Sequence, residues 1–348
     1  MDPNLNEKIR ESREKMGRDL KESTIKTYVK NIKNLSRFLS DKEPAEEQGG
    51  IEWLKDVEEV KKKIEDLKYN DTTKRNYYNS IIIYLQSISE DGENTEMISK
   101  YTKIRDEINK IYEESNASSV WSDKQLQNLI TAEEFYKMIA DIGRELRARQ
   151  LKNKKKTKGK ITEEDRALLQ IYTILNIHRE IPLRNDLAGM VYIKQKEFDN
   201  MDEEDKKVGN FLVEGKGIMF MSLNDYKTSR KYGSLKIMLS QGLRRIVRFH
   251  LHFCDTCYLL VRGDGKPMSK NLLTQVILKE FKKRTGKNIS TTMLRKIFLT
   301  EKYGTFKEEL EKDNTNMMHS MNEALSVYTK EPIEKALEKA KQKNNSEE

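Results

Sequence analysis

Two residues whose types could do chemistry stand nine positions apart in the stretch MMHSMNEALSVYTK, residues 317–330. They are His319 and Tyr328. A tyrosine hydroxyl can act as a nucleophile that stays covalently attached to its target. Its unperturbed pKa of about 10 makes it a poor nucleophile at neutral pH unless neighbouring groups assist it. A tyrosine at helical spacing is more often a packing residue, so the interval alone leaves both interpretations open.

Three further stretches supply the groups that such a tyrosine would need. They are LRNDLAG with Arg184, NDYKTSRKYG with Lys227, and STTMLRKIFLT with Arg295. Arginine can bind the nonbridging oxygens of a phosphate bidentately and stabilise transition-state charge, and a lysine on a mobile hairpin can protonate a departing oxygen. Each residue also has an ordinary structural explanation. Arg184 could pair with Asp186 or Glu180, and Lys227 could be a turn lysine.

The order and spacing of these four stretches resemble the active-site motifs of the tyrosine recombinase and phage integrase family, the Cre- and Xer-like enzymes. The resemblance implies that Tyr328 is the nucleophile. It assigns Arg184, Arg295 and His319 to stabilisation of the transition state. It makes Lys227, on the β-hairpin, the general acid that protonates the departing oxygen.

The sequence also departs from the family's pattern. The hairpin turn is long, so Lys231 is the alternative general acid. The position three before the second arginine is usually histidine and here is Thr292, and the glycine usual before the second histidine is Met318. The segment DNMDEEDKKVGN (199–210) looks like an insertion, which together with these changes suggests a divergent branch from a virus or mobile element. Tyr303 is the rival tyrosine, and we expect it to pack.

The composition points to a polyanionic partner. The chain has 348 residues and a formal net charge of +9, which favours nucleic acid or an anionic membrane surface. Membrane attachment is the weaker alternative, since no run approaches the roughly 20 apolar residues that a spanning helix needs and the first residues lack a signal peptide's apolar core. Two cysteines fit a reducing compartment. We expect an intracellular protein, in the host nucleus or cytoplasm, and not a secreted one.

The chain is long enough for two domains, since single hydrophobic cores stop growing at roughly 250–300 residues. Apolar residues recur at helical spacing in its first third, and the polar stretch 116–128 has no apolar period. These features predict a helical domain over residues 1–120 and a second domain over residues 121–348. The family resemblance implies that the first is a core-binding, DNA-binding domain. It implies that the second is the catalytic domain with a C-terminal tail, and that the two form a C-shaped clamp on DNA.

The fold class that we expect is mainly α with one small antiparallel β-sheet, an α+β arrangement. Residues 219–223 and 234–239 are rich in strand-forming types and flank a polar turn, which predicts a β-hairpin. Pro182 marks a turn, and LRNDLAG after it is typical of the start of a short helix.

Two clusters allow more than one interpretation. Six of the ten residues in LKNKKKTKGK (151–160) are lysine. This block is typical of a solvated loop, with a phosphate contact or a nuclear-import patch as alternatives. RFHLHFCDTC (248–257) holds four zinc-capable side chains. They are too tightly packed in sequence for one tetrahedral ion, so we favour a helix that packs.

The function implied by the resemblance is site-specific recombination, in which DNA strands are cut and rejoined through a 3′-phosphotyrosyl intermediate at Tyr328. Two alternatives stay open, a type IB topoisomerase-like relaxing enzyme and a noncatalytic DNA-binding relative, the latter favoured by Thr292. We expect no cofactor and no metal, because arginines can supply the charge that Mg²⁺ supplies in many nucleases. The expected partners are double-stranded DNA and a homo-tetramer on paired DNA sites, with no membrane. Residues 333–348 are a candidate helix for exchange between subunits.

Overall fold

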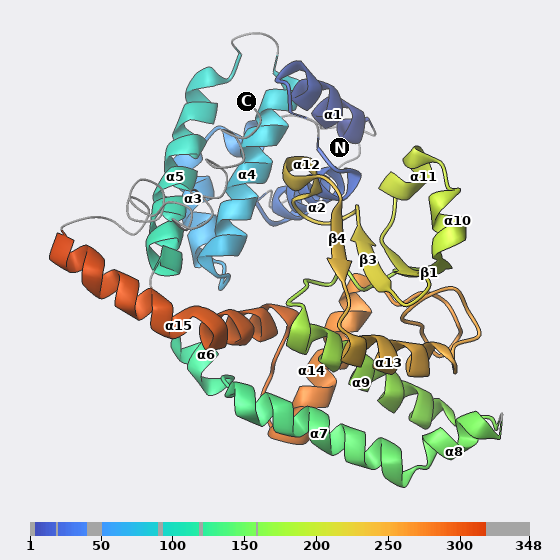
Figure 1. Ribbon diagram of the computed structural model, residues 1–348. Helices are drawn as coiled ribbons and strands as arrows, with labels where there is room; N and C mark the ends of the chain where they lie inside the picture. Colours follow the sequence, from blue (N-terminus) through green and yellow to red (C-terminus); the bar gives the residue numbers. More distant parts are fainter. Residues whose placement is uncertain are drawn as a thin grey trace, which may run out of the picture. The chain divides into compact units, whose positions relative to one another are not determined.

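The computed structural model describes residues 4–18, 20–39, 51–89, 93–117, 121–157 and 159–317. The chain divides into two compact units, Met1–Trp121 and Ser122–Glu348 (Figure 1). Within the described residues, no helix is long and apolar enough to cross a membrane. A clamp shape depends on how the two units are placed relative to one another, and it stays a prediction.

The first unit is built from helices. They are α1 (Leu5–Lys15), α2 (Glu22–Leu39), the 3₁₀-helix η1 (Glu52–Leu54), α3 (Val57–Asp66), α4 (Asp71–Ile88) and α5 (Thr95–Ala117). Helix α2 buries one apolar residue on each turn, as a helix packed on one face requires. Side-chain caps begin two of the others. Asp56 accepts a hydrogen bond from the Glu59 amide, and Asn70 accepts one from the Thr73 amide, each at 2.9 Å.

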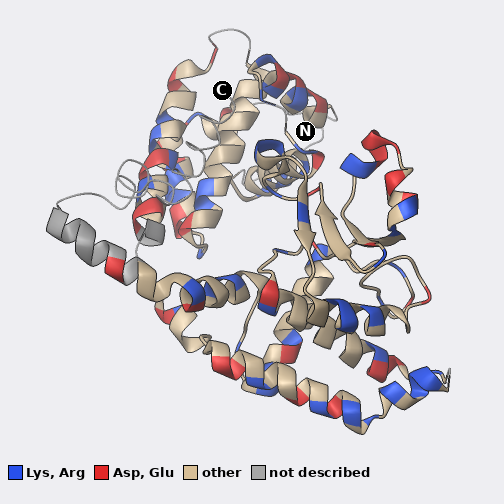
Figure 2. Ribbon diagram, in the orientation of Figure 1, with Lys and Arg blue, Asp and Glu red and all other residues tan. Residues whose placement is uncertain are grey.

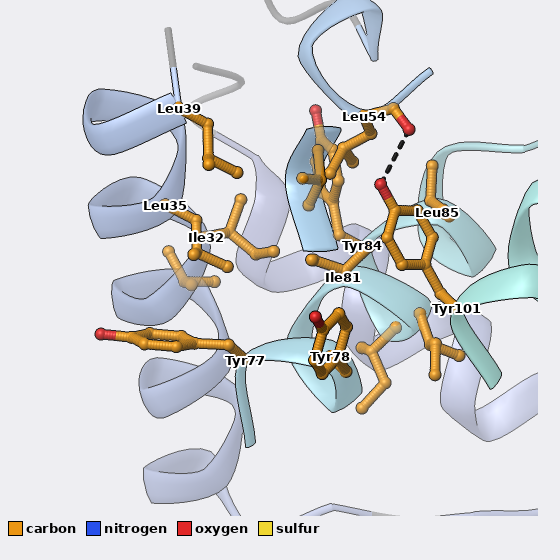
Figure 3. Close-up of a cluster of buried hydrophobic side chains, with 14 of the residues drawn as sticks. Ile32, Leu35, Leu39, Leu54, Tyr77, Tyr78, Ile81, Tyr84, Leu85 and Tyr101 are labelled. Atoms are coloured by element: carbon orange, nitrogen blue, oxygen red, sulfur yellow. Dashed lines mark hydrogen bonds between the residues drawn. The ribbon is translucent and has the colours of Figure 1, made fainter. Parts of the chain in front are cut away.

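Helix α4 carries the centre of this unit's core (Figure 3). Its residues Tyr78, Ile81 and Leu85 are at most 1% exposed. Tyr101 of α5 packs beside Tyr78, with ring centroids 6.3 Å apart. The Tyr101 hydroxyl donates a hydrogen bond of 2.8 Å to the Leu54 carbonyl oxygen, so this buried phenol keeps the partner that burial demands.

The second unit combines helices with a small sheet. The helices are α6 (Asp123–Gln127), α7 (Ala132–Ala148), α8 (Leu151–Lys156), α9 (Glu163–Glu180), α10 (Gln195–Asp199), α11 (Glu203–Lys207), α12 (Ser229–Tyr232), α13 (Gln241–Leu251), α14 (Lys270–Thr285) and α15 (Thr291–Met317). The strands are β1 (Val191–Lys194), β2 (Phe211–Glu214), β3 (Met219–Leu223) and β4 (Leu235–Met238). Helix α9 is the central element of this unit and packs against α7, α13 and α15.

The sheet has the strand order β1-β2-β3-β4. The predicted hairpin is confirmed, since β3 and β4 pair antiparallel with Leu223 opposite Leu235. A mainly helical chain with a small sheet is likewise confirmed, but the sheet is mixed rather than wholly antiparallel, because β1 pairs with β2 in parallel. The crossover 195–210 makes this possible, since parallel neighbours need a long connection. It holds α10 and α11 and includes the segment that was expected to be an insertion.

Two local predictions were wrong. LRNDLAG forms a turn instead of starting a helix. Its Asn185 side chain bonds to residues of α14 and α15, and Gly189 has a φ of +73°, outside the helical region. The lysine block is not a loop throughout, because Leu151–Lys156 forms helix α8, which Leu151 anchors at 1% exposed.

Candidate active site

Arg184 lies in the turn that directly follows helix α9. The helix ends at Glu180 because the next residue, Ile181, precedes a proline and adopts an extended conformation with φ −131° and ψ 103°. The neighbouring side chains of Leu183 and Leu187 are buried, whereas Arg184 is exposed. The buried leucines therefore fix the turn while the guanidinium stays accessible to a ligand.

Arg295 lies on the second turn of α15 and is half-buried. Its Nε donates a hydrogen bond of 3.1 Å to the carbonyl oxygen of Pro182, two residues before Arg184. Burial lowers the pKa of Arg295, the charge of Arg184 lowers it further, and the Asp186 carboxylate acts in the opposite direction. The two guanidinium groups are thus close enough to repel one another. An anion bound by both would relieve that repulsion.

The side chain of Asn185 fixes the turn to the helices around it. Its Nδ2 donates to the Thr274 hydroxyl at 2.7 Å and to the Lys270 carbonyl oxygen at 3.1 Å, both in α14. Its Oδ1 accepts a hydrogen bond of 2.9 Å from the hydroxyl of Thr291, the first residue of α15. One amide therefore sets the turn that carries Arg184 against the start of the helix that carries Arg295.

Asp186 belongs to the same turn as Arg184, and its residue is 8% exposed. Burial raises the pKa of its carboxyl group, while the charges of Lys270 and Arg184 and a backbone hydrogen bond from Arg184 lower it. Among the described residues, the Arg184 side chain forms no ion pair with either Asp186 or Glu180, the partners that a purely structural role would use. Its guanidinium is left to interact with a ligand.

Lys227 lies in the β3–β4 connection and is exposed. The base of this connection is joined to the Arg184 turn by Asn210, which is 7% exposed. Asn210 donates from Nδ2 to the carbonyl oxygens of Asp186, at 3.2 Å, and Asp225, at 3.0 Å. Its Oδ1 accepts from the amides of Asn224, at 2.9 Å, and Asp225, at 3.0 Å. The lysine is therefore two residues from a backbone segment that is fixed to the arginine site.

Of the other predicted site residues, Thr292 and Lys231 are described by the structure, and His319 and Tyr328 are not. Thr292 is exposed in the first turn of α15, three positions before Arg295. Lys231 is exposed in α12, with its Nζ 5.2 Å from the centroid of the Tyr232 ring. His319 and Tyr328 lie outside the described residues. Arg184, Arg295 and the base of the Lys227 connection are thus the parts that the structure brings together.

Tyr303 was expected to pack, and this was wrong. It is 48% exposed, as are its α15 neighbours Leu299, at 46%, and Phe306, at 57%. The reason is geometric, because residues four and three positions apart share one helix face, and this face of α15 is turned away from the core of its unit.

One residue near the arginines has no counterpart among the predicted site residues. His178 of α9 is 2% exposed, and neither ring nitrogen has a hydrogen-bond partner among the described residues. Burial lowers the pKa of its imidazole to about 4, with a further contribution from the charge of Arg295. A buried, neutral imidazole is therefore near enough to Arg295 to be influenced by its charge. In the sequence His178 stands in an apolar run and looks like any core residue. Only the folded structure shows that Arg295 is its neighbour.

Of the cysteine and histidine cluster, His250 is buried and Cys254 is half-buried, whereas His252 and Cys257 are exposed. Among the residues that the structure describes, no group of three or more His, Cys, Asp or Glu side chains is placed to hold a metal ion. Nε2 of His250 lies 2.8 Å from the carbonyl oxygen of Leu259 and 3.5 Å from Sγ of Cys254. The imidazole thus joins α13 to the segment that follows it.

The chain was compared with known proteins. No protein-family model matches it, and no curated protein matches its sequence. Among solved structures it is similar to the crystal structure of XerA recombinase, with 12% sequence identity, 97% of this chain and 98% of that chain covered, and a TM-score of 0.32. That TM-score is too low to establish a shared fold.

Proposed function

We propose that this protein breaks and rejoins DNA strands, with Tyr328 as the nucleophile. The observation that carries the proposal is the convergence of Arg184 and Arg295. Two guanidinium groups held together at some electrostatic cost are suited to bind the nonbridging oxygens of one phosphate. The net charge of +9 also favours a polyanionic substrate.

The reaction conserves the energy of the phosphodiester. The Tyr328 hydroxyl oxygen attacks the phosphorus and releases its proton to solvent, the bond between phosphorus and the 5′ oxygen breaks, and a 3′-phosphotyrosyl ester forms. Lys227 gives its proton to the departing 5′ oxygen. Attack by a 5′ hydroxyl on the tyrosyl ester then reverses these steps and joins a strand, with the proton returned to the lysine. No step consumes a co-reactant.

The arginines and His319 stabilise the charge that builds on the phosphate oxygens in the transition state. Fixed donors of this kind are typically worth about 10²–10³ in rate each. The Pro182 carbonyl occupies only the Nε of Arg295, which leaves the terminal nitrogens of this guanidinium for the phosphate. Asn185 holds the supporting elements in place.

A second candidate function is DNA binding without turnover. The observation that favours it is the exposed Thr292, a hydroxyl at the position where the family's pattern has an imidazole. A threonine donates a weaker hydrogen bond than an imidazolium does. This substitution lowers the stabilisation available to the transition state while leaving both arginines for binding.

The wider assembly is part of the same proposal. The helical unit Met1–Trp121 would be the second DNA-binding half, with phosphate contacts from lysines and arginines on its exposed helix faces. Strand exchange between two duplexes would need four protomers on paired sites. A DNA substrate of viral or mobile-element origin would place the protein in the host nucleus or cytoplasm.

The test is covalent capture on a nicked suicide duplex, in which the released strand diffuses away and the protein stays attached. We expect an adduct that withstands denaturation, and no adduct with Tyr328→Phe. DNA binding by the phenylalanine variant should match that of the unaltered protein. An adduct that persists in Tyr328→Phe would contradict the assigned nucleophile.

The same assay separates the other functions. DNA binding without an adduct would favour the noncatalytic candidate. An adduct accompanied by relaxation of supercoiled plasmid, with no requirement for paired sites, would favour a topoisomerase-like activity. Strand exchange that depends on two sites would favour recombination.

A further inference from the structure

A basic pocket of about 360 Å³ lies in the second unit, where α7, α8, α9 and α13 meet. Four of its lining side chains are cationic: Arg147, Lys152, Lys155 and Arg245. No aspartate or glutamate is among the residues that line it. The pocket thus gathers positive charge that the proposed catalytic function does not use.

Two carboxylates of the surrounding helices, one on α7 and one on α9, are paired with other cations. Asp165 lies 2.9 Å from Arg149 and 2.8 Å from Lys154, and Glu145 binds Arg284 through two hydrogen bonds of 2.6 and 3.0 Å. These partners lower the pKa of Glu145 and of Asp165. None of the four cations of the pocket forms an ion pair with a described residue, so their charge is open to a ligand.

The floor of the pocket is apolar. It is made by Leu146, Leu169, Ile246 and the rings of Tyr172 and Phe249. Lys155 lies over the Phe249 ring, with its Nζ 5.6 Å from the centroid. Gly143 lets α7 pack closely against the Tyr172 ring, because a Cβ at this position would stand 3.3 Å from that ring. A ligand here meets apolar surface below and positive charge around the rim.

We propose that this pocket docks an acidic segment of a partner protein, one that inserts a leucine or phenylalanine side chain between flanking glutamates or aspartates. Carboxylates would meet the four cations, and the apolar side chain would cover the floor. Figure 2 shows that α8 is mostly Lys, in line with a rim that attracts anions. Complementary charge of this kind steers association and sets specificity.

Duplex DNA suits this surface less well than an acidic peptide does. Its phosphates match the rim, but its bases are stacked inside the helix and cannot cover an apolar floor. The pocket is also separate from the arginine site. Tyr172 lies eight positions before the end of α9 at Glu180, about 12 Å of helix, and the Arg184 turn lies beyond that end. Occupation of the pocket therefore leaves room for DNA at the arginines.

The test uses fluorescence anisotropy with the full chain and a short labelled peptide in which glutamates flank one leucine and one phenylalanine. Arg147→Glu combined with Lys155→Glu should weaken binding at least about tenfold, because two attractions become repulsions. The matched control is Lys156→Glu with Lys160→Glu, which reverses two exposed lysines of the same block outside the pocket. It should bind the peptide nearly as well as the unaltered protein.

Two further arms make the result specific. A peptide with serine in place of both apolar residues should bind markedly more weakly. Equal binding of the serine peptide, equal losses in both double variants, or no saturable binding of the first peptide would each overturn the proposal. One further outcome would overturn it: unlabelled duplex DNA displaces the peptide, and the Arg147→Glu, Lys155→Glu variant loses DNA binding as strongly as it loses peptide binding. The surface would then be a nucleic-acid site. Unchanged circular dichroism and melting temperature confirm that each variant folds.

Discussion

Arg295 donates its Nε hydrogen to the carbonyl oxygen of Pro182 across 3.1 Å, although 113 positions separate the two residues in sequence. This bond joins helix α15 to the turn that carries Arg184. It also orients a guanidinium whose charge is already disfavoured by burial and by the second arginine. An anion bound nearby would offset this unfavourable charge, and the bond to Pro182 uses only the Nε of Arg295, so its terminal nitrogens stay available for that anion.

Arg295→Lys should reduce covalent adduct formation by about 10²–10³. The lysine keeps the positive charge but cannot bond Pro182 through an Nε hydrogen and also present two donors to a phosphate. The rate of adduct formation on the nicked suicide duplex measures the effect. DNA affinity should change far less than this rate.

The matched control for this change is Arg262→Lys. The side chain of Arg262 is 50% exposed, and its guanidinium forms an ion pair of 3.0 Å with the Asp264 carboxylate. We expect that variant to form the adduct at the unaltered rate. Similar losses in both variants would mean that the Pro182 contact has no special role.

Asn210→Ala should destabilise the second unit by roughly 2–4 kcal/mol, because it removes hydrogen bonds to a buried carbonyl of Asp186 and to part-buried backbone groups of Asp225. Urea unfolding followed by circular dichroism gives the free energy of unfolding from the midpoint and slope. Asn153→Ala, an exposed position on α8, is the control and should change the stability by less than about 0.5 kcal/mol. If Asn210→Ala lowers the free energy of unfolding by no more than the control does, water replaces the hydrogen bonds of Asn210.

Some of these features could be predicted from sequence and others could not. The β3–β4 hairpin follows from strand-forming runs on either side of a polar turn, which are local signals. The parallel pairing of β1 with β2 depends on the crossover 195–210 folding back, and no local pattern records that. LRNDLAG has the composition of a helix start, but its Asn185 side chain bonds to α14 and α15 and holds a turn instead.

The candidate site divides in the same way. Sequence motifs predict Arg184, Arg295 and Lys227, and the structure brings the two arginines and the base of the lysine's connection together. Asn210 and His178 were missed because their importance comes from neighbours distant in sequence. Asn210 has backbone partners on two separate turns, and a buried histidine beside an arginine looks like any other residue of an apolar helix.

Thr292→His should raise the rate of adduct formation several-fold, because an imidazole three positions before Arg295 adds a donor for the phosphate. The position is exposed, so the change should alter stability by no more than about 0.5 kcal/mol. Thr300→His, at an exposed position on the same helix, is the control for a nonspecific effect of histidine. An unchanged or lower rate in Thr292→His would indicate that the site is arranged around the threonine.

His178 should make the folded protein sensitive to acid. Its pKa of about 4 in the folded state lies below the value near 6.5 expected after unfolding, so the unfolded state binds more protons between these limits. Stability contributed by the neutral imidazole is therefore complete above about pH 6.5 and decreases as the pH falls towards 4, by about 3 kcal/mol in total. His250, also with a pKa of about 4, acts in the same direction. Urea unfolding from about pH 7 to about pH 5 should show a shallower loss of stability for His178→Asn than for the unaltered protein. Equal slopes for His178→Asn and the unaltered protein would mean that His178 is protonated, or hydrated, in the folded state.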